Sequence, residues 1–265
     1  MSTRLTPTIL RFDSLPSTNT EAARQAALGA HEGLCVVARE QTAGRGRRER
    51  TWVSPKDAGL YLSVVLRPAF EPREWPLITL AAALAAHDAL GEVCGLEADI
   101  KWPNDLLAGG RKLCGILAET SEGVRGRAVV LGVGVNLTRG SFPEEIRDTA
   151  TSVEEQTGRA PDREALLAAL LRSIARHYET LHSPGGASRI VQVCETRSSY
   201  AHGRRVRVAL AEETFEGITR GLAPDGALLL ETDDGAVRTV TAGDVTAVRE
   251  IHMDGQDGRD KQLKI

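Results

Sequence analysis

Aromatic side chains are scarce in this chain of 265 residues, at 4% of its composition. A core must therefore be built from leucine, valine, isoleucine and alanine. The four cysteines have no CxxC spacing, and each lies among apolar neighbours. This pattern disfavours a zinc site or a disulfide framework and predicts small, buried thiols at Cys35, Cys94, Cys114 and Cys194.

The chain also lacks an excess of either charge, since 36 acidic and 33 basic residues give a net charge of −3. Dedicated nucleic-acid-binding proteins are usually strongly basic, so we expect no DNA partner. Residues 1–17 lack the apolar core of a signal peptide, and no apolar run approaches the length of a membrane span. These absences predict a cytoplasmic protein without a membrane partner.

Hydrophobic periodicity predicts a mixed α/β domain over residues 1–198. Thr18 and Glu21 have the spacing of a capping box, and Gly29 should end the helix that they begin. Further helices are expected at residues 74–90, 162–182 and 187–196. Strands are expected at residues 9–12, 34–39, 60–66, 98–102, 113–119 and 128–136.

The pattern changes near residue 199. Five short strand-like pieces separated by Gly, Pro and Asp turns fill residues 199–250, which predicts a small β-barrel. Residues 251–265 are polar and rich in turn formers, a composition typical of a disordered tail. We therefore expect a large α/β domain followed by a small all-β domain.

Residues 41–52, QTAGRGRRERTW, form the most unusual segment, called the arginine loop below. Its glycines let the backbone approach a ligand closely, and its guanidinium groups suit phosphate or carboxylate oxygens. A lid over an anionic ligand and a solvated basic loop explain the segment equally well. The residues concerned are Gly44, Arg45, Gly46, Arg47, Arg48, Arg50 and Trp52.

Three other segments place polar residues or glycines where apolar residues are expected. Ser17-Thr18-Asn19 stands at a helix N-terminus, where hydroxyls either cap the helix or bind a polar ligand. In residues 101–119, KWPNDLLAGGRKLCGILAE, the apolar strand after Lys112 should hold that lysine at the edge of a sheet. Residues 132–136, GVGVN, alternate glycines within a strand, which often marks close approach of a ligand. Each segment alone has an equally good structural explanation, and neither glycine pair has a phosphate-loop fingerprint.

The order of these motifs resembles that of the bacterial biotin protein ligases. The motifs are STN, then Q-x-A-GRGRR-x-x-x-W, KWPNDL, RKLxGIL-x-E and GxGxN, and the resemblance covers residues 8–250. It implies a central mixed β-sheet flanked by helices, as in class II tRNA synthetases, with an SH3-like C-terminal barrel. It also implies ATP-dependent activation of biotin as biotinyl-5′-AMP, with Mg²⁺, and transfer to a lysine of the biotin carboxyl carrier protein of acetyl-CoA carboxylase.

The resemblance implies roles for individual residues. The matching biotin-binding positions are Ser17, Thr18, Asn19, Gln41, Arg45, Gly46, Arg47, Lys112 and Gly115. The matching nucleotide-binding positions are Trp52, Lys101, Asn104, Gly132, Gly134 and Asn136. The matching catalytic positions are Lys101, Asp105, Lys112 and Arg47, and we expect no metal-ligating residue in this chain.

Two departures and two alternatives accompany this prediction. Glu49 stands where some family members have glycine, so it could stiffen the loop or pair with Arg47 or Arg48. No DNA-binding domain precedes the catalytic motifs, which resembles the monofunctional type, and homodimers occur among family members. The nearest alternative is a lipoate or octanoyl transferase, whose motifs differ from GRGRR and KWPND. The second alternative is a ligand-sensing or nucleic-acid-binding protein.

Overall fold

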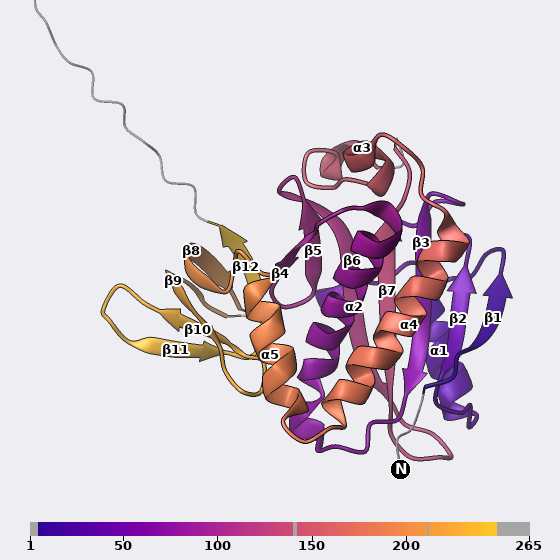
Figure 1. Ribbon diagram of the computed structural model, residues 1–265, viewed down its shortest axis with the longest axis horizontal. Helices are drawn as coiled ribbons and strands as arrows, with labels where there is room; N and C mark the ends of the chain where they lie inside the picture. The colour runs from indigo at the N-terminus through magenta and orange to yellow at the C-terminus, as the bar shows by residue number, and fades with distance from the viewer. Residues whose placement is uncertain (1–4, 140–141, 211, 248–265) are drawn as a thin grey trace, which may run out of the picture.

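The computed structural model describes residues 5–139, 142–210 and 212–247 (Figure 1). Seven strands form a central sheet in which β1 and β2 run parallel and every other neighbouring pair is antiparallel. In spatial order they are β1 (Thr8–Phe12), β2 (Leu34–Ala38), β3 (Gly59–Leu66), β7 (Ala128–Asn136), β6 (Arg111–Ser121), β5 (Asp105–Ala108) and β4 (Asp99–Lys101).

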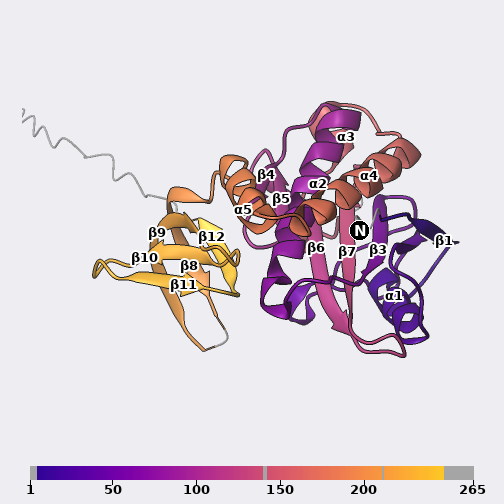
Figure 2. The same ribbon diagram turned by 60° about the horizontal axis from the view of Figure 1, so that its bottom comes forward.

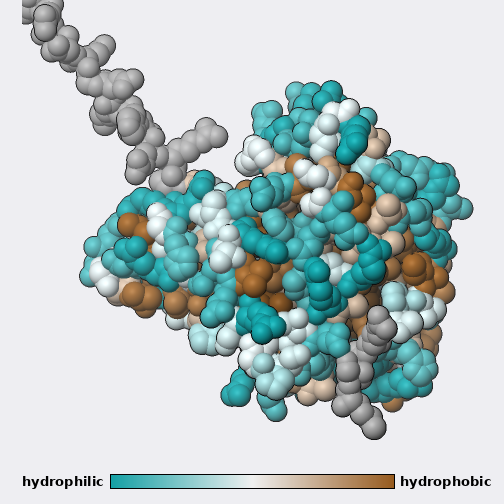
Figure 3. Space-filling model, viewed as in Figure 1, coloured by the Kyte–Doolittle hydropathy of each residue, from teal (hydrophilic) through white to brown (hydrophobic). Residues whose placement is uncertain are grey.

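Helices cover both faces of this sheet. The long helices α2 and α4 pack against one face, and α1 packs against the other (Figure 2). Most of the molecular surface on the α2 and α4 side is hydrophilic (Figure 3). The α-helices are α1 (Thr18–Ala27), α2 (Pro76–Cys94), α3 (Val153–Thr157), α4 (Arg163–Leu181) and α5 (Gly186–Thr196), with 3-10 turns at Arg47–Glu49, Pro72–Glu74 and Glu144–Ile146.

A second sheet follows α5, with five antiparallel strands and an interior of valine and leucine side chains. It is joined to the first unit by side chains, for example by Trp102, whose indole N–H donates to the Gly226 carbonyl at 2.9 Å. Its strands are β8 (His202–Ala209), β9 (Thr214–Leu222), β10 (Leu228–Glu231), β11 (Val237–Val240) and β12 (Asp244–Ala247). The tail prediction for residues 251–265 lies outside the described residues.

Helix α2 corrects two expectations. It begins at Pro76 and continues to Cys94, where Gly95 ends it in a left-handed conformation, so it extends beyond the predicted 74–90. With the preceding turn it is 23 residues long and apolar enough to cross a membrane by length and composition, so the statement that no run approaches this length is wrong. Two thirds of its most apolar stretch, 67%, is buried inside the molecule, as in a core helix.

Three smaller predictions also differ from the structure. The N-cap of α1 is Ser17, not Thr18, because the Ser17 hydroxyl accepts from the Thr20 amide while Glu21 pairs with Arg24. Lys112 lies on β6, which is paired on both sides, and not at a sheet edge. Strand β5 and helix α3 were not expected, since four and five residues are too few to show a hydrophobic period.

Candidate active site

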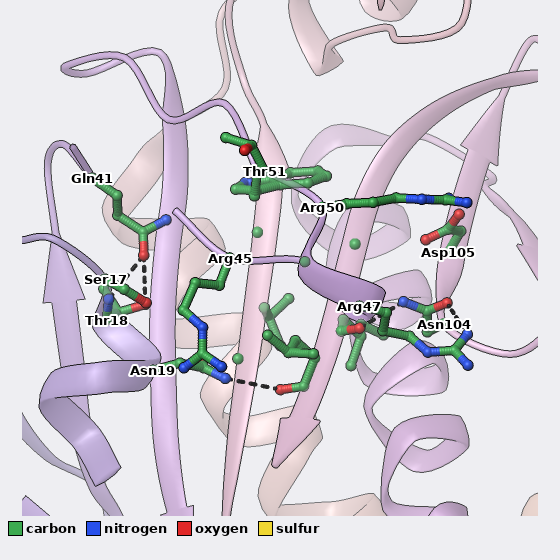
Figure 4. Close-up of a pocket in the computed structure, with 18 of the residues that line it drawn as sticks. Ser17, Thr18, Asn19, Gln41, Arg45, Arg47, Arg50, Thr51, Asn104 and Asp105 are labelled. Carbon is green, nitrogen blue, oxygen red and sulfur yellow. Dashed lines mark hydrogen bonds between the residues drawn. The ribbon is translucent and has the colours of Figure 1, made fainter. Parts of the chain in front are cut away.

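The N-terminus of α1 forms one end of the candidate site. Ser17, Thr18 and Asn19 are all at most 5% exposed, although all are polar. The Gln41 side-chain oxygen accepts from the Thr18 amide at 2.8 Å and from the Thr18 hydroxyl at 3.1 Å (Figure 4). Polar groups are thus held in fixed directions at a helix terminus that favours electronegative ligand atoms.

Glycines in β6 and β7 leave room for larger side chains above the sheet. Gly115 and Gly134 are paired across the two strands, and Gly132 lies on the same face, two residues before Gly134. A Cβ atom on Gly134 would lie 2.5 Å from the Trp52 indole nitrogen, and one on Gly115 would lie 2.9 Å from the same ring. A Cβ atom on Gly132 would overlap the Asn19 side-chain oxygen. The glycines of the predicted motifs therefore make space for Trp52 and Asn19.

The arginine loop closes on itself above these strands. Gln41 bridges to Ser54, and Arg45 bridges to Thr51, so the two arms run side by side. At its turn Arg48 and Glu49 both have positive φ, 52° and 60°, which side-chain-bearing residues rarely adopt. Trp52, on the returning arm, lies over the glycines.

Each arginine of the loop has its own contacts. Arg45 forms an ion pair with Glu119 at 2.5 Å. Arg48, at 3.3 Å, and Arg50 both pair with Asp244 of β12, in the second sheet. The two expected pairings of Glu49 are therefore not confirmed: Arg48 binds Asp244, and Arg47, described next, also binds other groups.

Arg47 differs from the other three because its contacts are neutral. It donates to the Asn104 side-chain oxygen at 3.1 Å and to the Gly243 carbonyl at 3.3 Å. Burial lowers the pKa of Arg47, with a partial counteracting effect from Asp244. A partly buried guanidinium that is bonded to no carboxylate among the described residues favours the arrival of an anion.

Lys112 and Asp105 form the other end of the site. The Lys112 ammonium lies 2.7 Å from a carboxylate oxygen of Asp105, but too far off axis for a hydrogen bond. The ammonium also lies 5.4 Å from the centre of the Trp52 ring. The Trp52 indole N–H is buried and, within the described part of the chain, has no hydrogen-bond partner. Both features suit a polar ligand between Trp52 and Lys112.

One pocket joins these parts. Of the residues predicted from sequence, Ser17, Thr18, Asn19, Gln41, Arg45, Gly46, Arg47, Trp52, Asn104, Asp105, Lys112, Gly115, Gly132 and Gly134 line it. Figure 4 shows Gln41 and the α1 residues on one side and Asn104, Asp105, Arg47 and Arg50 on the other. The pocket is further lined by Arg50, Thr51, Ile116, Leu117 and Val133, which lie within the motifs but received no ligand-binding role from the resemblance, and by Leu62 and Asp244, which lie outside them.

Two predicted residues do not line the pocket. Asn136 donates to the carbonyls of Thr151, at 3.0 Å, and Lys112, at 3.4 Å, and so ties the segment after β7 to β6. Lys101 lies 5.9 Å from the centre of the Tyr200 ring, and burial lowers its pKa. Both residues are neighbours of pocket residues, since Lys101 pairs with Asp105 and Asn136 follows Gly134 in β7. Because neither lines the pocket itself, their predicted nucleotide-binding and catalytic roles rest on the motif match alone.

Comparison with known proteins agrees with this geometry. A model described as "Biotin/lipoate A/B protein ligase family" matches residues 11–136, and one described as "Biotin protein ligase C terminal domain" matches residues 201–246. The biotin--[acetyl-CoA-carboxylase] ligase of Mycobacterium tuberculosis is 37% identical over 239 residues, which cover 88% of this chain and 86% of that protein. The ligase of the same name from Paracoccus denitrificans is 39% identical over 226 residues, which cover 83% of this chain and 92% of that protein.

A solved structure gives the same result for the fold. The biotin protein ligase from Aquifex aeolicus, in complex with biotin and ATP, has a TM-score of 0.79 and 29% sequence identity, covering 91% of this chain and 99% of that one. The expected fold, a central mixed sheet flanked by helices with a small β domain after it, is confirmed. By sequence identity over most of its length, by both family models and by fold, the chain belongs to the biotin protein ligases.

Proposed function

We propose that this chain is an ATP-dependent ligase that converts biotin to biotinyl-5′-AMP and transfers biotin to a lysine of the biotin carboxyl carrier protein of acetyl-CoA carboxylase. The relatives named biotin--[acetyl-CoA-carboxylase] ligase and the neighbour solved with biotin and ATP support this activity. The observation that carries it is the pocket, because one cavity joins a neutral hydrogen-bonding end to a cationic end. Biotin has a neutral ureido ring and a carboxylate tail, which matches that order.

The first step brings a carboxylate to a phosphate, and their like charges must be neutralised. Lys112 and Arg47, which line the pocket, are the cations that we propose for this task, with Lys101 beside them on the strand paired to Asp105. Arg47 has neutral partners, so an incoming anion need not displace a carboxylate from it. Fixed cations in a water-poor site lower the barrier by stabilising charge that develops in the transition state.

The second step needs a neutral amine on the acceptor lysine. Asp105 is the carboxylate that we propose to orient that amine or accept its proton. Its ion pair with Lys112 supports this role, because both residues line the pocket. The arginine loop would exclude water from the adenylate, whose mixed anhydride is prone to hydrolysis.

Mg²⁺ fits this site as part of the nucleotide. Among the described residues, no group of three or more His, Cys, Asp or Glu could hold a metal ion by itself. Mg²⁺ is commonly bound by substrate phosphates with one or two carboxylates, and Asp105 and Asp244 both line the pocket. The ion would add positive charge at the phosphates.

The organisation of the protein is part of the same proposal. We place catalysis in residues 1–198 with an accessory β unit at 199–250, and we expect a cytoplasmic enzyme that acts on its carrier without DNA or membrane. Pairing of two copies stays a prediction. The second sheet has a direct part in the site, since Asp244 and Gly243 contact the arginine loop.

Mass spectrometry of a biotin carboxyl carrier domain tests the function. We expect the domain to gain one biotinyl group after incubation with ATP, Mg²⁺, biotin and this protein, and no gain without ATP. A parallel reaction with lipoate separates the alternatives, because one matched family model covers both ligase types. Transfer of lipoate alone would refute the proposal.

A further inference from the structure

Polar contacts run without a break from the base of the arginine loop, through the start of α1, to Arg45 within the loop. Every link is a hydrogen bond or ion pair between 2.5 and 3.1 Å. The order of the residues is Ser54, Gln41, Thr18, Ser63, Asn19, Glu119 and Arg45.

Glu119, near the end of β6, is the link between Asn19 and Arg45 in this chain of contacts. One of its carboxylate oxygens accepts from the Asn19 amide nitrogen at 2.9 Å, and the other accepts from Arg45 at 2.5 Å. Its side chain is 30% exposed, so solvent only partly screens these charge-assisted bonds. The carboxylate thus joins α1 to the arginine loop, although Glu119 is not among the described residues that line the pocket.

The contacts of Asn19 leave its amide one orientation. Its nitrogen faces two groups that only accept, the Glu119 carboxylate and the Leu117 carbonyl at 3.3 Å. Its oxygen faces the Ser63 hydroxyl at 2.6 Å and fills the space above Gly132. A flipped amide would set its amino group against no carboxylate and its oxygen against two acceptors, so Glu119, together with the Leu117 carbonyl, determines which atom Asn19 presents at the pocket wall.

We propose that Glu119 is a positioning residue for biotin, acting through Asn19 and Arg45. This inference rests on the proposed function and places the biotin ring at the α1 end of the pocket. The nucleotide end, with Lys112 and Asp105, does not contact Glu119 through any described bond. Loss of the carboxylate therefore weakens biotin binding and spares ATP binding.

The test is the variant Glu119→Gln, which keeps the size of the side chain. Glutamine has one acceptor oxygen for two donors, so Asn19 or Arg45 loses its partner. We measure biotin-dependent pyrophosphate release, first varying the biotin concentration at saturating MgATP and then varying the MgATP concentration at saturating biotin. The KM for biotin should rise about ten- to a hundredfold, as for loss of a hydrogen bond to a charged group. The KM for ATP should stay within about twofold of wild type.

The matched control is Glu122→Gln, in the turn just after β6. Its side chain is 76% exposed and pairs with Arg127 at 3.5 Å, so neither KM should change. Should the Gln variant not fold, Glu119→Asp keeps the charge but is one methylene shorter, and it should raise the KM for biotin by a smaller factor.

Two results would overturn the inference. An unchanged KM for biotin in a folded Glu119 variant, even one of lowered stability, would leave Glu119 a purely structural residue. An equal rise in both KM values would mean that it only holds the loop. The wild-type chain separates this failure from failure of the proposed function: without biotin-dependent pyrophosphate release by wild type, both are wrong.

Discussion

The glycines of β7 offer a quantitative test of the site, because the same substitution meets different neighbours at two positions. Alanine at Gly134 would place its methyl group against the Trp52 ring, and alanine at Gly132 would place it against the Asn19 amide. Both glycines have an extended backbone that alanine also adopts, so the cost of each substitution depends only on the space around the added methyl group. Trp52 borders the open pocket and can shift, whereas Asn19 is bonded to Ser63, Leu117 and Glu119.

Gly132→Ala should therefore destabilise the fold more than Gly134→Ala. Overpacking typically costs about 1–3 kcal/mol, and displacing Asn19 breaks buried hydrogen bonds worth about 1–3 kcal/mol when a partner is left unpaired. We expect the free energy of unfolding to fall by about 2–4 kcal/mol for Gly132→Ala and by about 1 kcal/mol for Gly134→Ala. The second variant should mainly lose ligand affinity, since Trp52 is pushed into the pocket.

Urea denaturation gives the unfolding free energies, and isothermal titration gives biotin affinity. Gly91→Ala is the control, because a methyl group there meets no atom within 4 Å on the exposed side of α2. It should stabilise the protein by about 0.5–1 kcal/mol, the gain of alanine over glycine in a helix. Equal losses at Gly132 and Gly134, or a loss at Gly91, would refute the reasoning.

Three further outcomes are expected. Lys112→Ala should slow biotin-dependent pyrophosphate release at least about a hundredfold without unfolding, unlike Lys56→Ala at an exposed site; retained release would contradict the assignment. Asp244→Asn removes the partner of Arg48 and Arg50 and should speed tryptic cleavage in the arginine loop, whereas Asp233→Asn, which affects Arg205, should not. Lowering the pH from 7 to 5 should reduce the free energy of unfolding, measured by urea denaturation, more for wild type than for the His177→Gln variant. Equal reductions in the two proteins would show that His177 is not the source of the pH dependence.

The sign of the pH effect follows from the folded pKa of His177. Burial lowers this pKa below its usual value, although the bond to Asp88 at 2.7 Å raises it in part. The unfolded chain then binds a proton more readily as the pH falls through about 6.5, so stability is lost there. Asp88 acts lower on the scale: burial raises its pKa, but the bonds from His177 and Arg197 lower it overall. Its contribution is lost only as the pH falls below about 4.

The predictions from sequence succeeded where a local pattern carries the information. Long helices and strands have a hydrophobic period, and the pocket residues of STN, the arginine loop and GVGVN stand in contiguous motifs. The partners of those residues were missed because they are distant in the chain. Glu119 is 100 residues from Asn19, and Asp244 is 194 residues from Arg50. Ser63 carried a usable signal, because a small polar residue stands among the apolar residues of the buried strand GLYLSVVL.

The sequence left open whether Glu49 stiffens the arginine loop, and the structure shows backbone strain at Arg48 and Glu49 that the ion pairs to Asp244 offset only in part. A left-handed backbone costs about 1–2 kcal/mol at each of Arg48 and Glu49. The opposing ion pairs to Asp244 are partly exposed, with 35% of Arg48 and 67% of Arg50 accessible, so each contributes at most about 1 kcal/mol. Because the strain of the two residues, about 2–4 kcal/mol, is at least as large as the attraction of the two ion pairs, at most about 2 kcal/mol, an anion that offers the arginines better partners can displace Asp244. The loop is thus held in place and can be rearranged by its ligand.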